Sequence, residues 1–232
     1  MNEATIVRRT LFGAGRYLSL HIQPKSSNYS WISGQWVDFV VPNLTKNGIR
    51  SDKNDTTTPV VVGGYSICSP TGKGEFELLI QQTEHQPTKH LFSGKSNIGD
   101  SVLVGAASGS CVYRPELHRD IVLLAGGVGI TPLISMFRTF SVAKAASTAT
   151  ATTSAVLYHG IKSPNDKLFQ DEFPPEHAFI SSQGQRINFI EIGTKHGPDK
   201  DYFVCGPTRF IDQGIRDLKS IGCHKIHFER WW

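Results

Sequence analysis

The hydrophobic pattern of this 232-residue chain changes its period near the middle. The first half contains short β-prone runs, several of them alternating, at residues 5–9, 17–23, 35–41, 75–82 and 101–104, with glycines and prolines between them. The second half begins with a continuous apolar run at residues 120–125, which is typical of a parallel strand covered on both faces. We therefore expect an antiparallel β-barrel over residues 1–117 and a parallel-sheet α/β domain over residues 118–232.

Further elements are predicted for the second half from the same kind of pattern. Strand-like runs lie at residues 154–159, 187–192, 202–205 and 225–228, and helical patterns lie at residues 133–145 and between Pro207 and Gly222. Thr131 and Pro132 are predicted as the N-cap and first residue of the first of these helices. Two polar or low-complexity segments, residues 44–58 and 145–155, are predicted as a surface loop and a linker.

The distribution of charged and apolar residues argues against nucleic-acid binding and against a membrane span. The chain has 24 Lys and Arg against 20 Asp and Glu, and its basic residues never stand more than two in a row. Nucleic-acid binding needs a concentrated basic surface, so we do not expect it. A membrane span needs roughly 18–20 consecutive apolar residues, and no run of that length is present.

The cysteines and the first residues bear on metal binding and location. The four cysteines are not arranged in C-x-x-C pairs, so no metal or iron–sulfur site is predicted from them: Cys68, Cys111, Cys205 and Cys223. The first 15 residues contain no apolar signal region. We expect free thiols, a cytoplasmic or mitochondrial-matrix location, and no presequence within this chain.

The strongest local motif is a strand followed by a glycine-rich turn and a helix. The turn is Gly126-Gly127-Val128-Gly129-Ile130-Thr131-Pro132. Glycines let a backbone approach a pyrophosphate, and a helix N-terminus offers free N–H groups to anionic oxygens. The spacing differs from the G-x-G-x-x-G pattern, and the motif alone is equally consistent with a structural turn.

Two other motifs have both a functional and a structural interpretation. Cys205-Gly206-Pro207 follows a predicted strand and opens a helix, at the sheet edge where open α/β sheets bind ligands. Alone, it is equally explained by a buried small side chain and a helix-start proline. Tyr65 and Ser66, followed by Ile67 and Cys68, are suited to hold a flat heterocycle, or they form an ordinary cross-strand pair.

Taken together and in this order, the three motifs resemble the ferredoxin–NADP reductase superfamily. The likeness covers nearly the whole chain and includes Ser33-Gly34-Gln35-Trp36, Pro87-Thr88-Lys89-His90-Leu91 and the tail His227-Phe228-Glu229-Arg230-Trp231-Trp232. Within the superfamily, the chain looks most like the oxidoreductase NAD-binding domain-containing proteins. The resemblance implies an antiparallel Greek-key flavin-binding β-barrel followed by a nicotinamide-nucleotide-binding α/β domain.

The resemblance also implies cofactors, partners and site residues. It implies a flavin-dependent enzyme that transfers hydride between NADH or NADPH and FAD, with onward transfer of electrons to a separate acceptor, for which a small redox protein is a candidate. Ser66, Cys205 and Glu229 are the implied catalytic residues. The implied flavin-binding residues are Tyr65, Ser66, Ile67, Cys68, Ile80, Gln81, Pro87, Thr88, Lys89, Trp231 and Trp232. The implied nicotinamide-nucleotide residues are Gly126, Gly127, Gly129, Ile130, Thr131, Pro132, Cys205, Gly206 and Pro207.

One departure from the family pattern leaves an alternative function open. The family's flavin motif begins with an arginine that pairs with flavin phosphate, and Gly63 stands at that place here. The alternative is a nucleotide-binding or sensing module of the same fold in which flavin binding is weak or lost. For the coenzyme, Thr194, Lys195 and His196 are candidate partners of a 2′-phosphate, but the family's clearer signature is absent and NADH is favoured.

Overall fold

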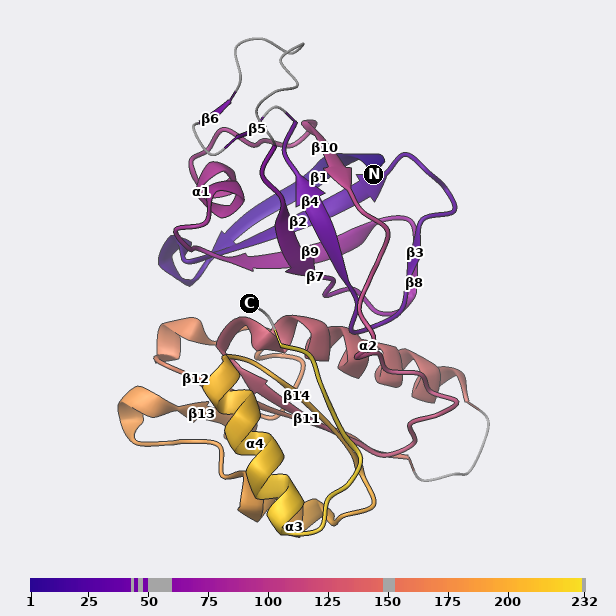
Figure 1. The fold of residues 1–232 in the computed structure, drawn as a ribbon, viewed down its shortest axis with the longest axis vertical. Helices are drawn as coiled ribbons and strands as arrows, with labels where there is room; N and C mark the ends of the chain where they lie inside the picture. Colours follow the sequence, from indigo (N-terminus) through magenta and orange to yellow (C-terminus); the bar gives the residue numbers. More distant parts are fainter. Residues whose placement is uncertain (43, 46–47, 50–59, 148–152, 231–232) are drawn as a thin grey trace.

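Two packed halves make up the molecule, a curled β-sheet and an α/β layer structure (Figure 1). The structure is a computed structural model that describes residues 1–42, 44–45, 48–49, 60–147 and 153–230. Most of the predicted loop at residues 44–58 lies outside the described residues, and so do residues 148–152 of the predicted linker at residues 145–155. The domain boundary at residue 117 stays a prediction.

The first half is almost entirely β-structure. Its strands are β1 (Asn2–Phe12), β2 (Tyr17–Pro24), β3 (Ser30–Trp31), β4 (Trp36–Val40), β5 (Leu44–Thr45), β6 (Gly48–Ile49), β7 (Gly63–Ser66), β8 (Gly72–Lys73), β9 (Phe76–Gln81) and β10 (Ser101–Val104). One helix, α1 (Gln86–Phe92), follows β9. The five strand runs predicted for this half are confirmed.

Six of these strands form one antiparallel sheet in the order β7-β4-β10-β1-β2-β9. The sheet curls until its outer strands approach each other, through the bridge between Ile67 and Leu78 and the bond from the Cys68 N–H to the Glu77 carbonyl at 2.8 Å. Inward-facing side chains such as Ile6, Leu20 and Phe39 fill the inside of the curl. The expected antiparallel β-barrel is therefore present as a six-stranded curled sheet, and the fold class is confirmed.

The second half alternates strands and helices. It comprises β11 (Ile121–Gly126), α2 (Ile130–Ala146), β12 (Ala155–Ile161), β13 (Ala178–Ile180), α3 (Phe189–His196), β14 (Asp201–Cys205), α4 (Thr208–Ser220) and β15 (Ile226–Phe228). The five strands form a parallel sheet in the order β13-β12-β11-β14-β15.

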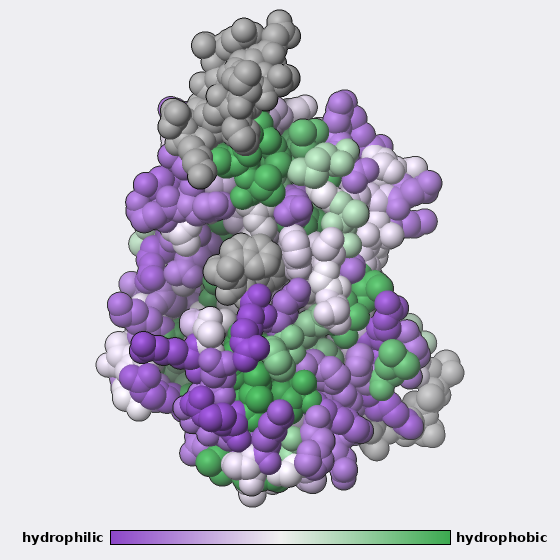
Figure 2. Space-filling view, viewed as in Figure 1, coloured by the Kyte–Doolittle hydropathy of each residue, from purple (hydrophilic) through white to green (hydrophobic). Residues whose placement is uncertain are grey.

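Strand β11 is apolar along its whole length because both of its faces are covered. Ile121 and Leu123 pack in the cluster that includes α2, whereas Val122 and Leu124 pack in the cluster that includes α3 and α4. Helix α2 lies between the parallel sheet and the curled sheet, and α3 and α4 cover the other face (Figure 1). The view in Figure 2 shows that polar side chains prevail on the outer surface on this side, with smaller hydrophobic patches between them.

Two sequence predictions in this half are wrong. Residues 187–192 were expected to form a strand, but α3 begins at Phe189. The Asn188 side chain caps this helix by accepting the Glu191 N–H at 3.2 Å, and Phe189, Ile192 and Gly193 are buried with helical spacing. Thr131 is not the N-cap and Pro132 is not the first helical residue, because helix α2 already begins at Ile130 after the N-cap Gly129.

Polar contacts fix the two halves against each other. Arg138 on α2 donates to Glu77 on β9 at 2.9 Å and to Glu172 at 2.6 and 2.8 Å. At the other end of the interface, Asp166 accepts from the Arg16 guanidinium at 2.5 Å and from the Tyr17 hydroxyl at 3.1 Å. The halves therefore have a defined mutual orientation, and this orientation sets the shape of the cleft between them.

Within the part of the chain that the structure describes, no helix combines the length and the apolar character needed to cross a bilayer.

Candidate functional site

The order of strands in the parallel sheet reverses between β11 and β14. From β11 the chain builds outwards through β12 and β13, and it then returns to the other side of β11 with β14 and β15. The loops that leave the carboxyl ends of β11 and β14 therefore turn to opposite sides and leave a crevice between them. These loops are the glycine-rich turn and the Cys205-Gly206-Pro207 turn, which the register places side by side because Ala125 pairs with Cys205.

The two turns touch through their backbones, and this contact requires glycine. A Cβ on Gly129 would lie 2.5 Å from the Cys205 carbonyl oxygen and 2.6 Å from the Gly206 nitrogen. A Cβ on Gly206 would lie 3.0 Å from the Gly126 Cα. Gly127 is needed for another reason: its φ is +54°, and a Cβ there would have no neighbour within 4 Å.

A buried histidine forms a hydrogen bond to the backbone of the glycine-rich turn. The Nε2 of His159 on β12 donates to the Gly127 carbonyl at 2.8 Å. Its Nδ1 is buried and has no hydrogen-bond partner among the described residues. Burial lowers the pKa of this imidazole to about 4, so the ring is neutral at pH 7. Sequence reasoning did not single out His159, because its only signal was a polar residue near the end of a buried strand.

A cleft of about 760 Å³ opens between the two turns and the curled sheet. The volume lies within the range of about 300–1,000 Å³ that is common for sites of small molecules and cofactors. Both halves contribute to its walls. Its lining residues are Gly64, Tyr65, Ser66, Leu79, Ile80, Gln81, Thr83, His85, Thr88, Gly126, Gly127, Val128, Gly129, Thr131, Cys205, Gly206, Pro207 and Thr208.

Tyr65 is held firmly on the wall that the curled sheet provides. Its hydroxyl is 3.0 Å from the Thr88 hydroxyl, and its ring packs edge-on against Phe39 with the centroids 5.9 Å apart. Burial raises the pKa of the Tyr65 hydroxyl to about 12, against a smaller lowering by Thr88, so the group stays protonated at neutral pH. The ring also lies over Gly63, where a Cβ would come within 2.7 Å of it.

Cys205 and Glu229 meet at a small enclosed cavity next to the cleft. The cavity has a volume of about 10 Å³ and is also lined by Pro132 and Cys111. The Trp36 indole N–H donates to the Glu229 carboxylate at 3.2 Å. Burial raises the pKa of Glu229, and the indole only partly counters this. Glu229 is therefore a carboxyl group whose protonated form is favoured relative to an exposed glutamate.

The structure brings most of the residues expected at the site into one place. The cleft contains Tyr65, Ser66, Ile80, Gln81, Thr88, Gly126, Gly127, Gly129, Thr131, Cys205, Gly206 and Pro207, while Pro132 and Glu229 line the adjoining small cavity. Ile67, Cys68 and Ile130 are instead fully buried, Pro87 is buried in α1, and Lys89 is exposed. Trp231 and Trp232 lie outside the described residues.

Several lining residues were missed by the sequence analysis. They are Gly64, Leu79, Thr83, His85, Val128 and Thr208. All but Thr83 and His85 directly adjoin a predicted site residue, so their neighbours in sequence were the available signal.

No lysine or arginine is among the described residues that line the cleft. Lys89 pairs with Glu84 at 2.5 Å, and its N–H already donates to the His85 carbonyl at 2.9 Å. Neither Lys89 nor His90 lines the cleft. An anionic ligand in this cleft would depend on backbone N–H groups, hydroxyls and His85.

The chain resembles known proteins in its sequence. Residues 123–178 match the family model of the oxidoreductase NAD-binding domain. The chain is 27% identical to oxidoreductase NAD-binding domain-containing protein 1 of Pongo abelii over 99% of this chain and 83% of that protein.

Solved structures show the same fold. One is the flavohem-like FAD/NAD binding domain of nitric oxide dioxygenase from Vibrio cholerae (TM-score 0.74, 18% identity, 99% of this chain and 98% of that one). Another is a ferredoxin NADP⁺ reductase from Neisseria gonorrhoeae with bound FAD and NADP (TM-score 0.72, 17% identity, 98% and 97%). The chain is thus similar in sequence to the oxidoreductase NAD-binding domain-containing proteins, residues 123–178 match the oxidoreductase NAD-binding domain, and the two-domain fold is that of the ferredoxin–NADP reductase family.

Proposed function

We propose that the chain is an FAD-dependent NAD(P)H oxidoreductase that passes electrons to a separate acceptor. One observation carries the proposal: a single cleft is lined both by the Tyr65-Ser66 segment of the curled sheet and by the two nucleotide turns of the parallel sheet. Such a cleft could bring a flavin and a nicotinamide together in one space. A small redox protein is our candidate acceptor.

The glycine-rich turn and the Cys205-Gly206-Pro207 turn would hold the nicotinamide nucleotide. Gly127 exposes its backbone in open space, which suits close approach by a phosphate or ribose. Gly129 lets the turns approach each other closely enough to define the width of the crevice. Cys205, 4% exposed at the end of β14, would lie beside the nicotinamide and fix its position by contact.

The residues on the curled sheet fit a flavin. Tyr65 offers a fixed aromatic ring, and no described residue hydrogen-bonds the Ser66 hydroxyl, which leaves it available to a heterocycle edge. The fold neighbours named for FAD support FAD rather than FMN. When bound, FAD supplies the carrier that accepts hydride from nicotinamide and releases electrons to the acceptor.

Glu229 would hold or move a proton next to this site. Its raised pKa favours the protonated carboxyl, and its bond to the Trp36 indole fixes its orientation. We propose that it orients the reacting groups or relays a proton.

We propose NADH as the coenzyme. Thr194, Lys195 and His196 lie on α3, not after a strand, and none of them lines the cleft. Without these residues, the described lining offers no lysine or arginine to bind a 2′-phosphate.

Anaerobic stopped-flow reduction tests the proposal directly. The protein is incubated with FAD, unbound flavin is removed, and flavin absorbance is followed after mixing with NADH or NADPH. Rapid bleaching, faster with NADH, is expected. Absence of flavin binding at micromolar FAD, or a bound flavin that neither coenzyme reduces, contradicts the proposal.

The second candidate is a nucleotide-sensing module that binds NAD(H) but not flavin. The lack of an arginine at position 63 and of basic residues in the described lining favours it, because charge-assisted contacts to the flavin phosphate would be missing. Calorimetric binding of NADH together with no visible absorbance after FAD addition would identify this function.

A further inference from the structure

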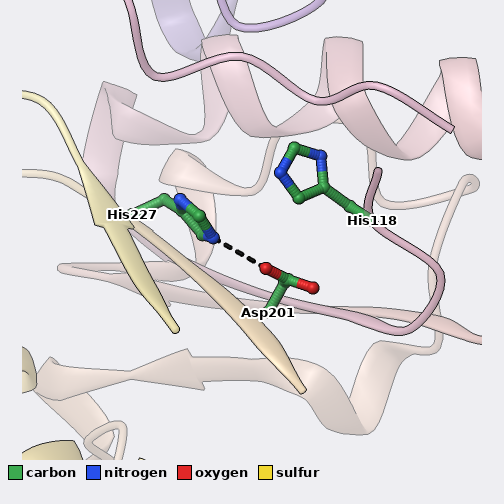
Figure 3. Close-up of side chains that lie close together, drawn as sticks. All are labelled: His118, Asp201 and His227. Atoms are coloured by element: carbon green, nitrogen blue, oxygen red, sulfur yellow. Dashed lines mark hydrogen bonds and ion pairs between the residues drawn. The ribbon is translucent and has the colours of Figure 1, made fainter. Parts of the chain in front are cut away.

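A second cluster of polar side chains lies at the amino edge of the parallel sheet, opposite the cleft. It contains His118 from the segment before β11, Asp201 at the start of β14 and His227 in β15 (Figure 3). One ligand atom from each side chain lies within 4.8 Å of those of the other two. Sequence patterns do not predict this cluster, because its members are far apart along the chain.

The two imidazoles are held in place by a shared aromatic ring. The His227 ring stacks on Phe203 with the centroids 4.5 Å apart, and the His118 ring packs edge-on against Phe203 at 5.3 Å. The His118 and His227 rings are themselves 5.2 Å apart. Packing of this kind limits the positions that the rings can take, so the cluster is partly organised in advance.

Asp201 has unused capacity to bind a cation. Its side chain is 12% exposed, and its Oδ1 accepts from the His227 Nε2 at 2.8 Å. An ionised carboxylate offers about four acceptor positions, and no other described side chain donates to this one. The neighbouring Lys200 does not neutralise it, because Lys200 pairs with Asp120 at 2.9 Å.

From these contacts we propose that His118, Asp201 and His227 form a binding site for a divalent transition-metal ion, with zinc as the preferred occupant. Two imidazole nitrogens and one carboxylate oxygen are a donor set suited to zinc, with water as a fourth ligand. Tetrahedral zinc with bonds of about 2.0–2.2 Å needs ligand atoms about 3.3–3.5 Å apart. The cluster therefore has to contract by at most about 1.5 Å, which side-chain rotation can supply.

Binding requires a change of tautomer at both rings but no net release of protons from neutral imidazoles. The Nδ1 of His118 accepts the Arg114 N–H at 3.1 Å, so the neutral ring carries its proton on Nε2. Nε2 is the nitrogen that points into the cluster in Figure 3. Coordination through Nε2 moves the ring proton to Nδ1 and breaks the bond to Arg114. In the same way, His227 exchanges its bond to Asp201 for a shared metal.

The ion would connect three segments of the chain, the one before β11, the start of β14 and strand β15. It would link β14 and β15 to the segment that joins the two halves of the molecule. Strand β15 ends one residue before Glu229. Metal occupancy is therefore expected to stabilise the position of the last strand without touching the cleft.

The test measures zinc and cobalt binding to the tag-free full chain. Isothermal titration with Zn²⁺ and the visible spectrum of added Co²⁺ are compared for the wild type, His118→Gln, Asp201→Asn and His227→Gln. His224→Gln is the matched control, because His224 is exposed and lies three residues before His227. We expect one bound ion per chain, and a dissociation constant at least about 100-fold weaker in each of the three variants but unchanged in the control.

Thermal unfolding in the presence of a chelator checks that the metal-free variants are folded. In a separate measurement without chelator, Zn²⁺ is expected to raise the unfolding temperature of the wild type and the control only. Nitrogen-15 shifts of the His118 ring give a readout that loss of structure would not mimic, since coordination moves the proton to Nδ1. Equal zinc binding in the wild type and in all three folded variants overturns the proposal, as does binding that His224→Gln removes. Neither result bears on the flavin reaction, which is measured separately.

Discussion

Adding one methyl group at Gly129 should separate the glycine-rich turn from the Cys205-Gly206-Pro207 turn. The φ of Gly129 is −61°, so alanine is conformationally acceptable there and on this ground alone would stabilise the fold by about 0.4–1 kcal/mol. The new Cβ, however, would lie 2.5 Å from the Cys205 carbonyl oxygen, whereas non-bonded atoms prefer roughly 3.5 Å or more. The turns must therefore move apart by about 1 Å, because the neighbouring atoms belong to the backbone.

The magnitude follows from these two opposing effects. Overpacking typically costs about 1–3 kcal/mol, so Gly129→Ala should lower the free energy of unfolding by about 1–2 kcal/mol in urea titrations. A 1 Å displacement of reacting groups costs on the order of 100-fold in rate, so flavin reduction by NADH in the stopped-flow assay should slow by about that factor.

Gly160→Ala is the matched control. Gly160 lies at the same end of the neighbouring strand β12, and a Cβ there would make only an ordinary contact of 3.4 Å with Ile187. Its unfolding free energy and its reduction rate should stay close to those of the wild type. A Gly129→Ala protein with unchanged coenzyme affinity and unchanged reduction rate would refute the argument that the spacing of the turns determines function.

Three further predictions concern the same site. Cys205→Ser should slow flavin reduction by about tenfold while leaving the flavin spectrum intact, because its contact positions the nicotinamide; an unchanged single-turnover rate would mean that Cys205 is only a packing residue. Burial lowers the pKa of His159 from 6.5 to about 4 in the folded protein, so between these pH values the unfolded protein binds more protons than the folded one. The contribution of His159 to stability is therefore present above pH 6.5 and is lost as the pH falls towards 4. In His159→Gln the decrease in unfolding free energy between these pH values should be smaller by about 3 kcal/mol, and an identical pH profile would contradict the assignment. Gly63→Arg should change the FAD dissociation constant by less than tenfold. The gain of about 1.5–3 kcal/mol from a phosphate contact is offset because the new side chain displaces the Tyr65 ring. A dissociation constant lowered a hundredfold would show that the Tyr65 ring moves aside at little cost.

The order of the elements could be predicted from the sequence because it depends on local chemistry. The change from alternating short strands to strand, glycine turn and helix predicted both halves, and the glycines at positions 126, 127 and 129 indicated the glycine-rich turn after β11. The error at residues 187–192 has a local origin too. A six-residue run with Ile187, Phe189 and Ile192 fits a strand as well as a helix, and only the cap at Asn188 and the burial of Gly193 against α4 distinguish them.

Tertiary structure alone decided which distant residues meet. The pairing of Ala125 with Cys205 brings two turns 80 residues apart into backbone contact, and the docking of α2 against the curled sheet through Arg138 turns them towards Tyr65 and Ser66. The cluster of His118, Asp201 and His227 arises in the same way at the opposite edge of the sheet. Sequence patterns indicate the preference of each segment for helix, strand or turn. Strand order and register are instead fixed by contacts between segments that are distant in the chain. A site that depends on strand order and register therefore forms only when the sheet has formed.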